Sequence, residues 1–111
     1  MNQNPVPEVS VQELKQHWDA GETPFLLDVR KPFETEIANL DGLLIPLNEL
    51  PHRLDELEPY QDEPIIVYCR SGARSAQAVR FLHASGFPKA VNLKGGVLAW
   101  SRDIDPSMPT Y

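Results

Sequence analysis

The chain contains 111 residues, of which 41% are hydrophobic and 23% charged, with a formal net charge of −6 and a single cysteine. This length and composition indicate one globular domain over residues 1–111 and leave no room for a second. An acidic chain is unsuited to nucleic acid or to an anionic membrane. One cysteine excludes an internal disulfide and a Cys-x-x-Cys metal site, and it fits a reducing compartment.

The first residues lack the pattern of a targeting signal. Residues 1–7 are polar and contain two prolines, without the basic and apolar regions of a signal peptide. No apolar run approaches the length of a membrane span. We therefore expect an irregular lead-in, no membrane contact and a cytoplasmic location.

The next segment predicts a helix followed by a buried strand. The sequence Ser-Val-Gln-Glu at residues 10–13 is a capping box, which starts a helix that ends before Gly21. Residues 25–29, Phe-Leu-Leu-Asp-Val, are apolar on both faces, which is typical of a central strand in a parallel sheet.

A charged residue lies inside that apolar strand. Asp28 needs a partner there, and Arg30 and Glu34 are spaced to form an ion pair across a turn. Ligands of open α/β sheets bind at the carboxyl ends of the strands. Asp28 and Arg30 are therefore candidates to support a site, although ion pairs of this kind can also simply tie loops together.

The rest of the chain continues to alternate between helices and strands. Residues 47–57 are helical in pattern, and residues 58–64 form a polar loop. Residues 90–93 predict a short strand, residues 94–100 lead through two glycines into a last helix, and the tail from residue 103 onward is expected to be irregular. This alternation predicts an α/β domain with a mainly parallel sheet.

The lone cysteine lies between a strand and a helix. Residues 65–68, Ile-Ile-Val-Tyr, predict a buried strand, and residues 75–82 predict a helix. Cys69 follows the strand directly, a turn containing Gly72 comes next, and Arg70 and Arg74 lie on either side of this turn.

That position favours a reactive thiolate beside an oxyanion pocket. The first N–H groups of a helix lack helical partners and attract anions, and cysteines there, beside Arg, ionise readily. Arginine adds planar donors that suit oxyanions. The alternative is that Cys69 is a small hydrophobic residue of the core. The three histidines have no spacing typical of a triad or a metal site, so we expect no metal: His17, His52 and His83.

The segment Cys69-Arg70-Ser71-Gly72-Ala73-Arg74-Ser75 resembles the active-site loop of the rhodanese (sulfurtransferase) family. Its Cys-x4-Arg spacing is that of sulfurtransferases, whereas phosphatases and arsenate reductases use Cys-x5-Arg. Asp-Val-Arg-x-Pro-x-Glu at residues 28–34 and Gly-Gly-x-x-x-Trp at residues 95–100 also resemble the family's motifs. Residues 37–43 depart from its Gly-His-Ile-x-Gly-Ala block. In this they look like the rhodanese domains of adenylyltransferase-sulfurtransferases in molybdopterin and thiamine biosynthesis.

The resemblance implies a small domain of about five mainly parallel strands with helices on both faces. It implies that Cys69 takes a sulfane sulfur from a small anionic donor such as thiosulfate, holds it as a persulfide and passes it to a nucleophile. No cofactor is implied. The substrate-binding loop would be Arg70, Ser71, Gly72, Ala73, Arg74 and Ser75.

Two alternatives remain open. The domain could be a relay module whose partner is a sulfur-carrier protein or a cysteine desulfurase, with thiosulfate activity incidental. It could also be a small phosphatase or arsenate reductase, which the four-residue spacing disfavours. A phosphatase would in addition need an acid for its leaving group.

Overall fold

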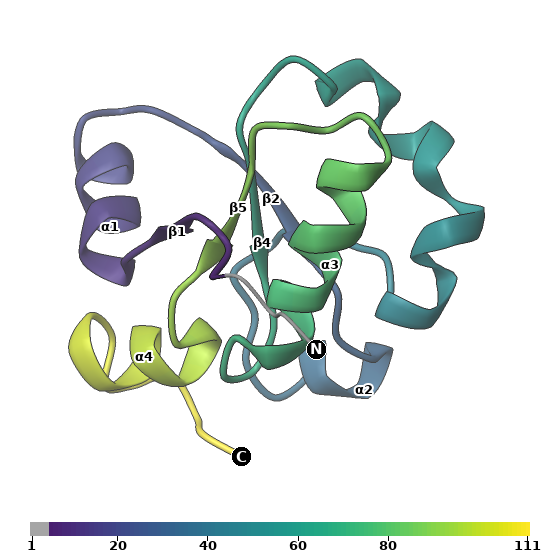
Figure 1. Ribbon diagram of the computed structural model, residues 1–111. Helices are drawn as coiled ribbons and strands as arrows, with labels where there is room; N and C mark the ends of the chain where they lie inside the picture. Colours follow the sequence, from purple (N-terminus) through teal and green to yellow (C-terminus); the bar gives the residue numbers. More distant parts are fainter. Residues whose placement is uncertain (1–4) are drawn as a thin grey trace.

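Five parallel strands form the centre of the computed structural model, which describes residues 5–111 (Figure 1). Their order in the sheet is β1-β5-β4-β2-β3, and every pairing is parallel. This confirms the predicted α/β fold. The irregular lead-in was predicted for residues 1–7, of which residues 1–4 lie outside the described part. The strands are β1 (Glu8–Val9), β2 (Phe25–Asp28), β3 (Leu43–Leu44), β4 (Ile65–Tyr68) and β5 (Ala90–Leu93).

Helices cover both faces of the sheet. One face packs against α1 (Val11–Asp19) and α4 (Gly96–Asp103), and the other packs against α3 (Ala73–Ala84) (Figure 1). A short helix, α2 (Pro32–Thr35), follows β2. As the capping box predicted, Ser10 Oγ accepts a bond from Glu13 N–H at 3.1 Å, and the Glu13 carboxylate accepts one from Ser10 N–H at 3.0 Å.

The helix expected over residues 47–57 is instead two 3₁₀ helices, η1 (Leu47–His52) and η2 (Leu54–Tyr60). Pro51 and Pro59 lie inside them, and proline has no N–H to donate to the i−4 carbonyl. The segments still bury Leu50 and Leu57, but as tighter and interrupted 3₁₀ turns.

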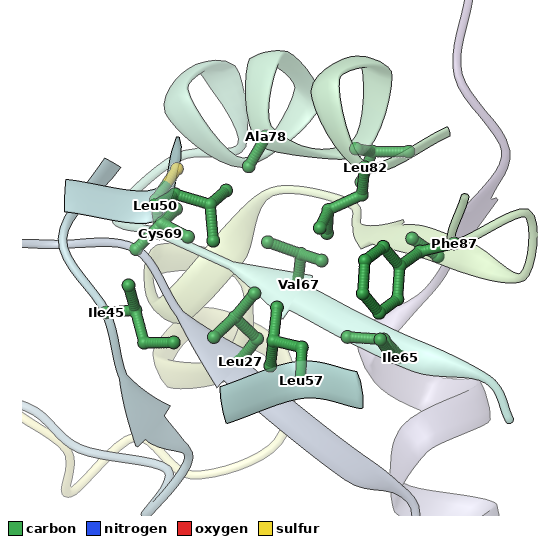
Figure 2. Packing of buried hydrophobic residues seen from close by; sticks show 13 residues of the cluster. Leu27, Ile45, Leu50, Leu57, Ile65, Val67, Cys69, Ala78, Leu82 and Phe87 are labelled. Atoms are coloured by element: carbon green, nitrogen blue, oxygen red, sulfur yellow. The ribbon is translucent and has the colours of Figure 1, made fainter. Parts of the chain in front are cut away.

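Alternate side chains of the central strands feed two separate cores. Leu27 of β2 and Val67 of β4 point toward α3 and the 3₁₀ helices (Figure 2), whereas Leu26 and Ile66 point toward α1 and α4. Cys69 belongs to the first core and extends it to the carboxyl end of β4 (Figure 2). The reactive candidate is thus anchored in the buried core.

No helix among residues 5–111 combines the length and the apolar character that a membrane crossing requires.

The start of α4 is fixed against the loop that carries Cys69. The N–H groups of Val97 and Leu98 donate to the carbonyls of Cys69 and Arg70, both at 3.1 Å. Helix-terminal N–H groups without helical partners are thereby satisfied. Gly96 permits this approach because its φ is +58° and a Cβ there would lie 2.3 Å from the Cys69 carbonyl oxygen.

We predict that Gly96→Ala lowers the free energy of unfolding by at least about 3 kcal/mol, because the new methyl group would displace the loop. Gly21→Ala is the matched control: its φ is also positive, at +79°, but a Cβ there meets nothing within 4 Å. We expect Gly21→Ala to lower the free energy of unfolding by only about 1 kcal/mol, because alanine is strained in the left-handed backbone conformation. Urea denaturation checks both values, and equal losses in the two variants would contradict the close contact.

Candidate active site

The carboxyl ends of three strands converge on one edge of the sheet. Asp28 ends β2, Cys69 follows β4, and Gly95 lies two residues beyond the end of β5. Between β4 and α3 the chain turns through Gly72, whose φ of +107° suits glycine. The loop expected at residues 69–75 is thus a turn over residues 69–72 followed by the first turn of α3.

The sulfur of Cys69 is surrounded by hydrogen-bond donors from this turn. Gly72 N–H lies 3.1 Å and Ser75 N–H 3.4 Å from Sγ. Ser75 Oγ lies 3.3 Å from Sγ but gives its one hydrogen to Asn92, so it is not a donor to the sulfur. Cys69 is only 1% exposed. It therefore belongs to the core, as the alternative interpretation held, yet the main-chain donors aimed at it are those that stabilise an anionic sulfur.

Asn92 holds Ser75 and the turn in place. Its side-chain oxygen accepts a bond from Ser75 Oγ at 2.5 Å, and its amide nitrogen donates to the Gly72 carbonyl at 3.3 Å and to Glu8 at 3.1 Å. Sequence reasoning missed this residue. The available signal was a single amide inside an otherwise apolar strand, where a buried polar group has to find partners.

Asp28 and Arg30 form a fully buried ion pair. Arg30 Nη2 lies 2.8 Å and Nε 3.0 Å from the Asp28 carboxylate, and Nη2 also donates to the Ala38 carbonyl at 2.8 Å. The expectation that Arg30 pairs with the Glu34 side chain is wrong. Asp28, two residues before Arg30, accepts bonds from both Nε and Nη2 of the guanidinium instead. Burial alone would lower the Arg30 pKa, but the bonds to Asp28 raise it.

Glu34 pairs instead with Arg74, from the first turn of α3. The two terminal nitrogens of Arg74 lie 2.7 and 2.8 Å from the two carboxylate oxygens. Arg74 lowers the pKa of Glu34 to about 2, against the opposing effect of burial. The interpretation of Arg74 as a substrate-binding group stays a prediction, and any such role has to compete with Glu34.

Tyr111 reaches this network from the tail. Its hydroxyl accepts a bond from Arg30 Nη1 and donates one to Glu34, both at 2.9 Å. Arg70 Nε donates to the main-chain oxygen of Tyr111, and the Arg70 guanidinium lies 5.2 Å from the centre of its ring. The tail backbone is irregular, as expected, but the position of Tyr111 had no local sequence signal.

The other predicted loop residues lie around the turn. Ser71 is exposed and Ala73 begins α3. Beside Arg74 the surface has an open hollow of about 480 Å³, lined by Val29, Lys31, Leu47, Asn48 and Arg74. Among residues 5–111, no three His, Cys, Asp or Glu side chains cluster as metal ligands would.

Comparison with known proteins agrees with this geometry. The chain is 36% identical over 104 residues to the probable adenylyltransferase/sulfurtransferase MoeZ of Mycobacterium tuberculosis. That match covers 93% of the chain but spans only about a quarter, 26%, of the length of MoeZ. A sulfurtransferase of Allochromatium vinosum is 37% identical over 98 residues, which cover 87% of the chain and 90% of that protein.

The fold has close counterparts among solved structures. A rhodanese-like domain protein from Staphylococcus aureus superposes with a TM-score of 0.79 at 29% identity, covering 95% of this chain and 98% of that one. The profile of the rhodanese-like domain matches residues 10–103. This range contains all three motifs and both ion pairs of the site, so the chain belongs to the rhodanese-like domain family.

Proposed function

We propose that the chain is a sulfurtransferase that carries a sulfane sulfur as a persulfide on Cys69. The observation that carries this proposal is the pair of main-chain N–H groups, from Gly72 and Ser75, directed at the sulfur. Sulfur transfer in general is supported by membership of the rhodanese-like family and by relatives named as sulfurtransferases.

The proposed reaction proceeds in two displacements. The Cys69 thiolate attacks the outer sulfur of a donor such as thiosulfate, a new S–S bond forms, and the old S–S bond breaks with its electron pair leaving on sulfite. The persulfide now carries the negative charge on its terminal sulfur, beside the N–H groups of the turn. An acceptor nucleophile then attacks that sulfur, and the bonding electrons return to Cys69 as thiolate.

The donor set suits one sulfur atom better than a tetrahedral oxyanion. The donors to Sγ are two main-chain N–H groups, while Arg74 is paired with Glu34. A phosphate or arsenate would need several donors converging on its oxygens. This favours sulfur transfer over a phosphatase or arsenate reductase.

A second candidate function is sulfur relay between proteins. It is favoured by the same Glu34–Arg74 pair, since a small dianionic donor needs cationic groups that a protein persulfide does not. The partner would be a sulfur-carrier protein or a cysteine desulfurase. In this case thiosulfate activity would be a side reaction of the same Cys69 chemistry.

The nucleophile is tested first by mass spectrometry. We expect the intact protein to gain the mass of one sulfur atom on incubation with thiosulfate and to lose it on addition of cyanide. Because the chain has a single cysteine, the site of loading is unambiguous. Cys69→Ser should gain nothing while unfolding at the same urea concentration as the parent. Loading of this variant would exclude the persulfide mechanism.

The role of Arg74 is tested by comparing two donors. We predict that Arg74→Ala raises the KM for thiosulfate roughly ten- to a hundredfold, as expected for one lost charge-assisted contact. Arg74→Lys keeps the charge but loses the fork, so the increase should be smaller. Transfer from a protein persulfide should be spared. Unchanged thiosulfate kinetics in Arg74→Ala would show that this arginine only holds Glu34.

The Glu34–Arg74 pair also predicts a pH dependence. The pKa of Glu34 is about 2 in the folded protein, below its ordinary value of 4.5. The carboxylate therefore stabilises the fold fully above pH 4.5, and this contribution is lost as the pH falls toward 2. We expect Glu34→Gln to lower the free energy of unfolding by about 1–3 kcal/mol at pH 7, and by much less at pH 3.

The control for this titration is Glu49→Gln, which removes an exposed carboxylate paired with Arg53. It should cost no more than about 1 kcal/mol at pH 7. Urea denaturation at the two pH values measures both variants. If Glu34→Gln lowers the free energy of unfolding as much at pH 3 as at pH 7, the lowered pKa of Glu34 is contradicted.

A further inference from the structure

Tyr111 lies among the charged side chains of the site, far from them in sequence. It contacts Arg70 directly and links the buried ion pair Asp28–Arg30 to the partly exposed pair Glu34–Arg74. We propose that Tyr111 is a positioning residue: its ring and main-chain oxygen hold Arg70 so that the free end of this guanidinium presents positive charge to an anionic donor approaching Cys69. This inference rests on the proposed function only in taking the anion to be a sulfur donor.

The hydroxyl of Tyr111 has a fixed role in the network. Arg30 can only donate, so the phenol oxygen accepts from Arg30 Nη1 and its own hydrogen must go to Glu34, at 2.9 Å in each case. Burial raises the pKa of Tyr111, which keeps this hydrogen in place at neutral pH. The ring is therefore pinned at its far end by two groups that are themselves buried and paired.

The near side of Tyr111 holds Arg70. The guanidinium lies over the ring, 5.2 Å from its centre, and Nε donates to the main-chain oxygen of the same residue. A long side chain that would otherwise sample many rotamers is thus restricted to one orientation. Among the described residues no protein acceptor bonds to Nη1 or Nη2 of Arg70, so both remain available for an oxyanion.

Hydrogen bonds and packing of the tail hold Tyr111 in this position. Asp105 N–H donates to the Trp100 carbonyl at 2.9 Å, and Ser101 Oγ donates to the Met108 carbonyl at 2.7 Å. Met108 and Tyr111 pack against the core beneath α4. The tail leaves α4 on the side of the molecule where α2 lies (Figure 1). These contacts make it a structured strap across the carboxyl edge of the sheet.

The test compares two alkylating reagents of similar size on the single cysteine. Iodoacetate is an anion and iodoacetamide is neutral, so the ratio of their rates with Cys69 reports positive charge held beside the sulfur. We expect Arg70→Ala to lower this ratio roughly three- to tenfold, and Tyr111→Ala to lower it by a similar factor. Tyr111→Phe, which keeps the ring over Arg70 and loses only the bonds of the hydroxyl, should lower it less.

The double variant separates positioning from a general loss of structure. If Tyr111 acts through Arg70, adding Tyr111→Ala to Arg70→Ala changes the ratio no further. The matched control is Tyr60→Ala, which removes another stacked tyrosine, paired with Phe25 at 3.9 Å between ring centres. It should lower stability while leaving the ratio unchanged. An unchanged ratio in Tyr111→Ala, or additive effects in the double variant, would overturn the inference.

Failure of the proposed function would look different. If thiosulfate and protein persulfides fail to load the parent protein but the alkylation ratio responds as expected, the sulfur-transfer proposal falls and the positioning role of Tyr111 stands. If sulfur loads normally but Tyr111→Ala leaves both the alkylation ratio and the thiosulfate KM unchanged, the positioning role of Tyr111 falls and the sulfur-transfer proposal stands.

Discussion

The site depends on the direction of the peptide groups that follow Cys69. The carbonyls of Cys69 and Arg70 point toward α4 and accept bonds from the N–H groups of Val97 and Leu98, while the N–H groups of Gly72 and Ser75 point toward the sulfur. A main chain fixed in this way needs no reorganisation when negative charge develops on sulfur. The packing of α4 on the loop, which requires a residue without a side chain at position 96, is therefore part of the site.

A second layer of charge surrounds this main-chain cradle. The Asp28–Arg30 pair is almost fully buried, and pairs of this kind add little stability compared with a well-packed apolar substitute. They do, however, fix geometry, because each partner left alone would be very costly. Tyr111 joins this pair to Glu34–Arg74 through one hydroxyl. The tail, β2, α2 and α3 are thereby held in one arrangement around the carboxyl edge of the sheet.

The parts of this structure with local causes could be predicted from the sequence. The capping box of α1 and the strand-turn-helix around Cys69 follow from residues a few positions apart. Two-residue strands such as β1 and β3 are too short for any periodic pattern, and prolines turned one apolar helix into two 3₁₀ segments. The pairing of Arg74 with Glu34, and the docking of Tyr111, join residues 40 or more positions apart. Such contacts are fixed by tertiary packing, which propensity and spacing do not report.

The arginines near Cys69 differ in whether a carboxylate pairs with them. Arg30 and Arg74 are each matched by a carboxylate, whereas Arg70 has no Asp or Glu partner among the described residues. Arg70 is therefore the arginine proposed to attract an anionic donor. In the proposed reaction, main-chain N–H groups would stabilise the persulfide whichever donor delivers the sulfur, while Arg70, in the role proposed for it, would favour anionic donors alone. Donor preference can therefore change without loss of sulfur holding, which fits a family whose members occur both as short sulfurtransferases and within longer proteins such as MoeZ.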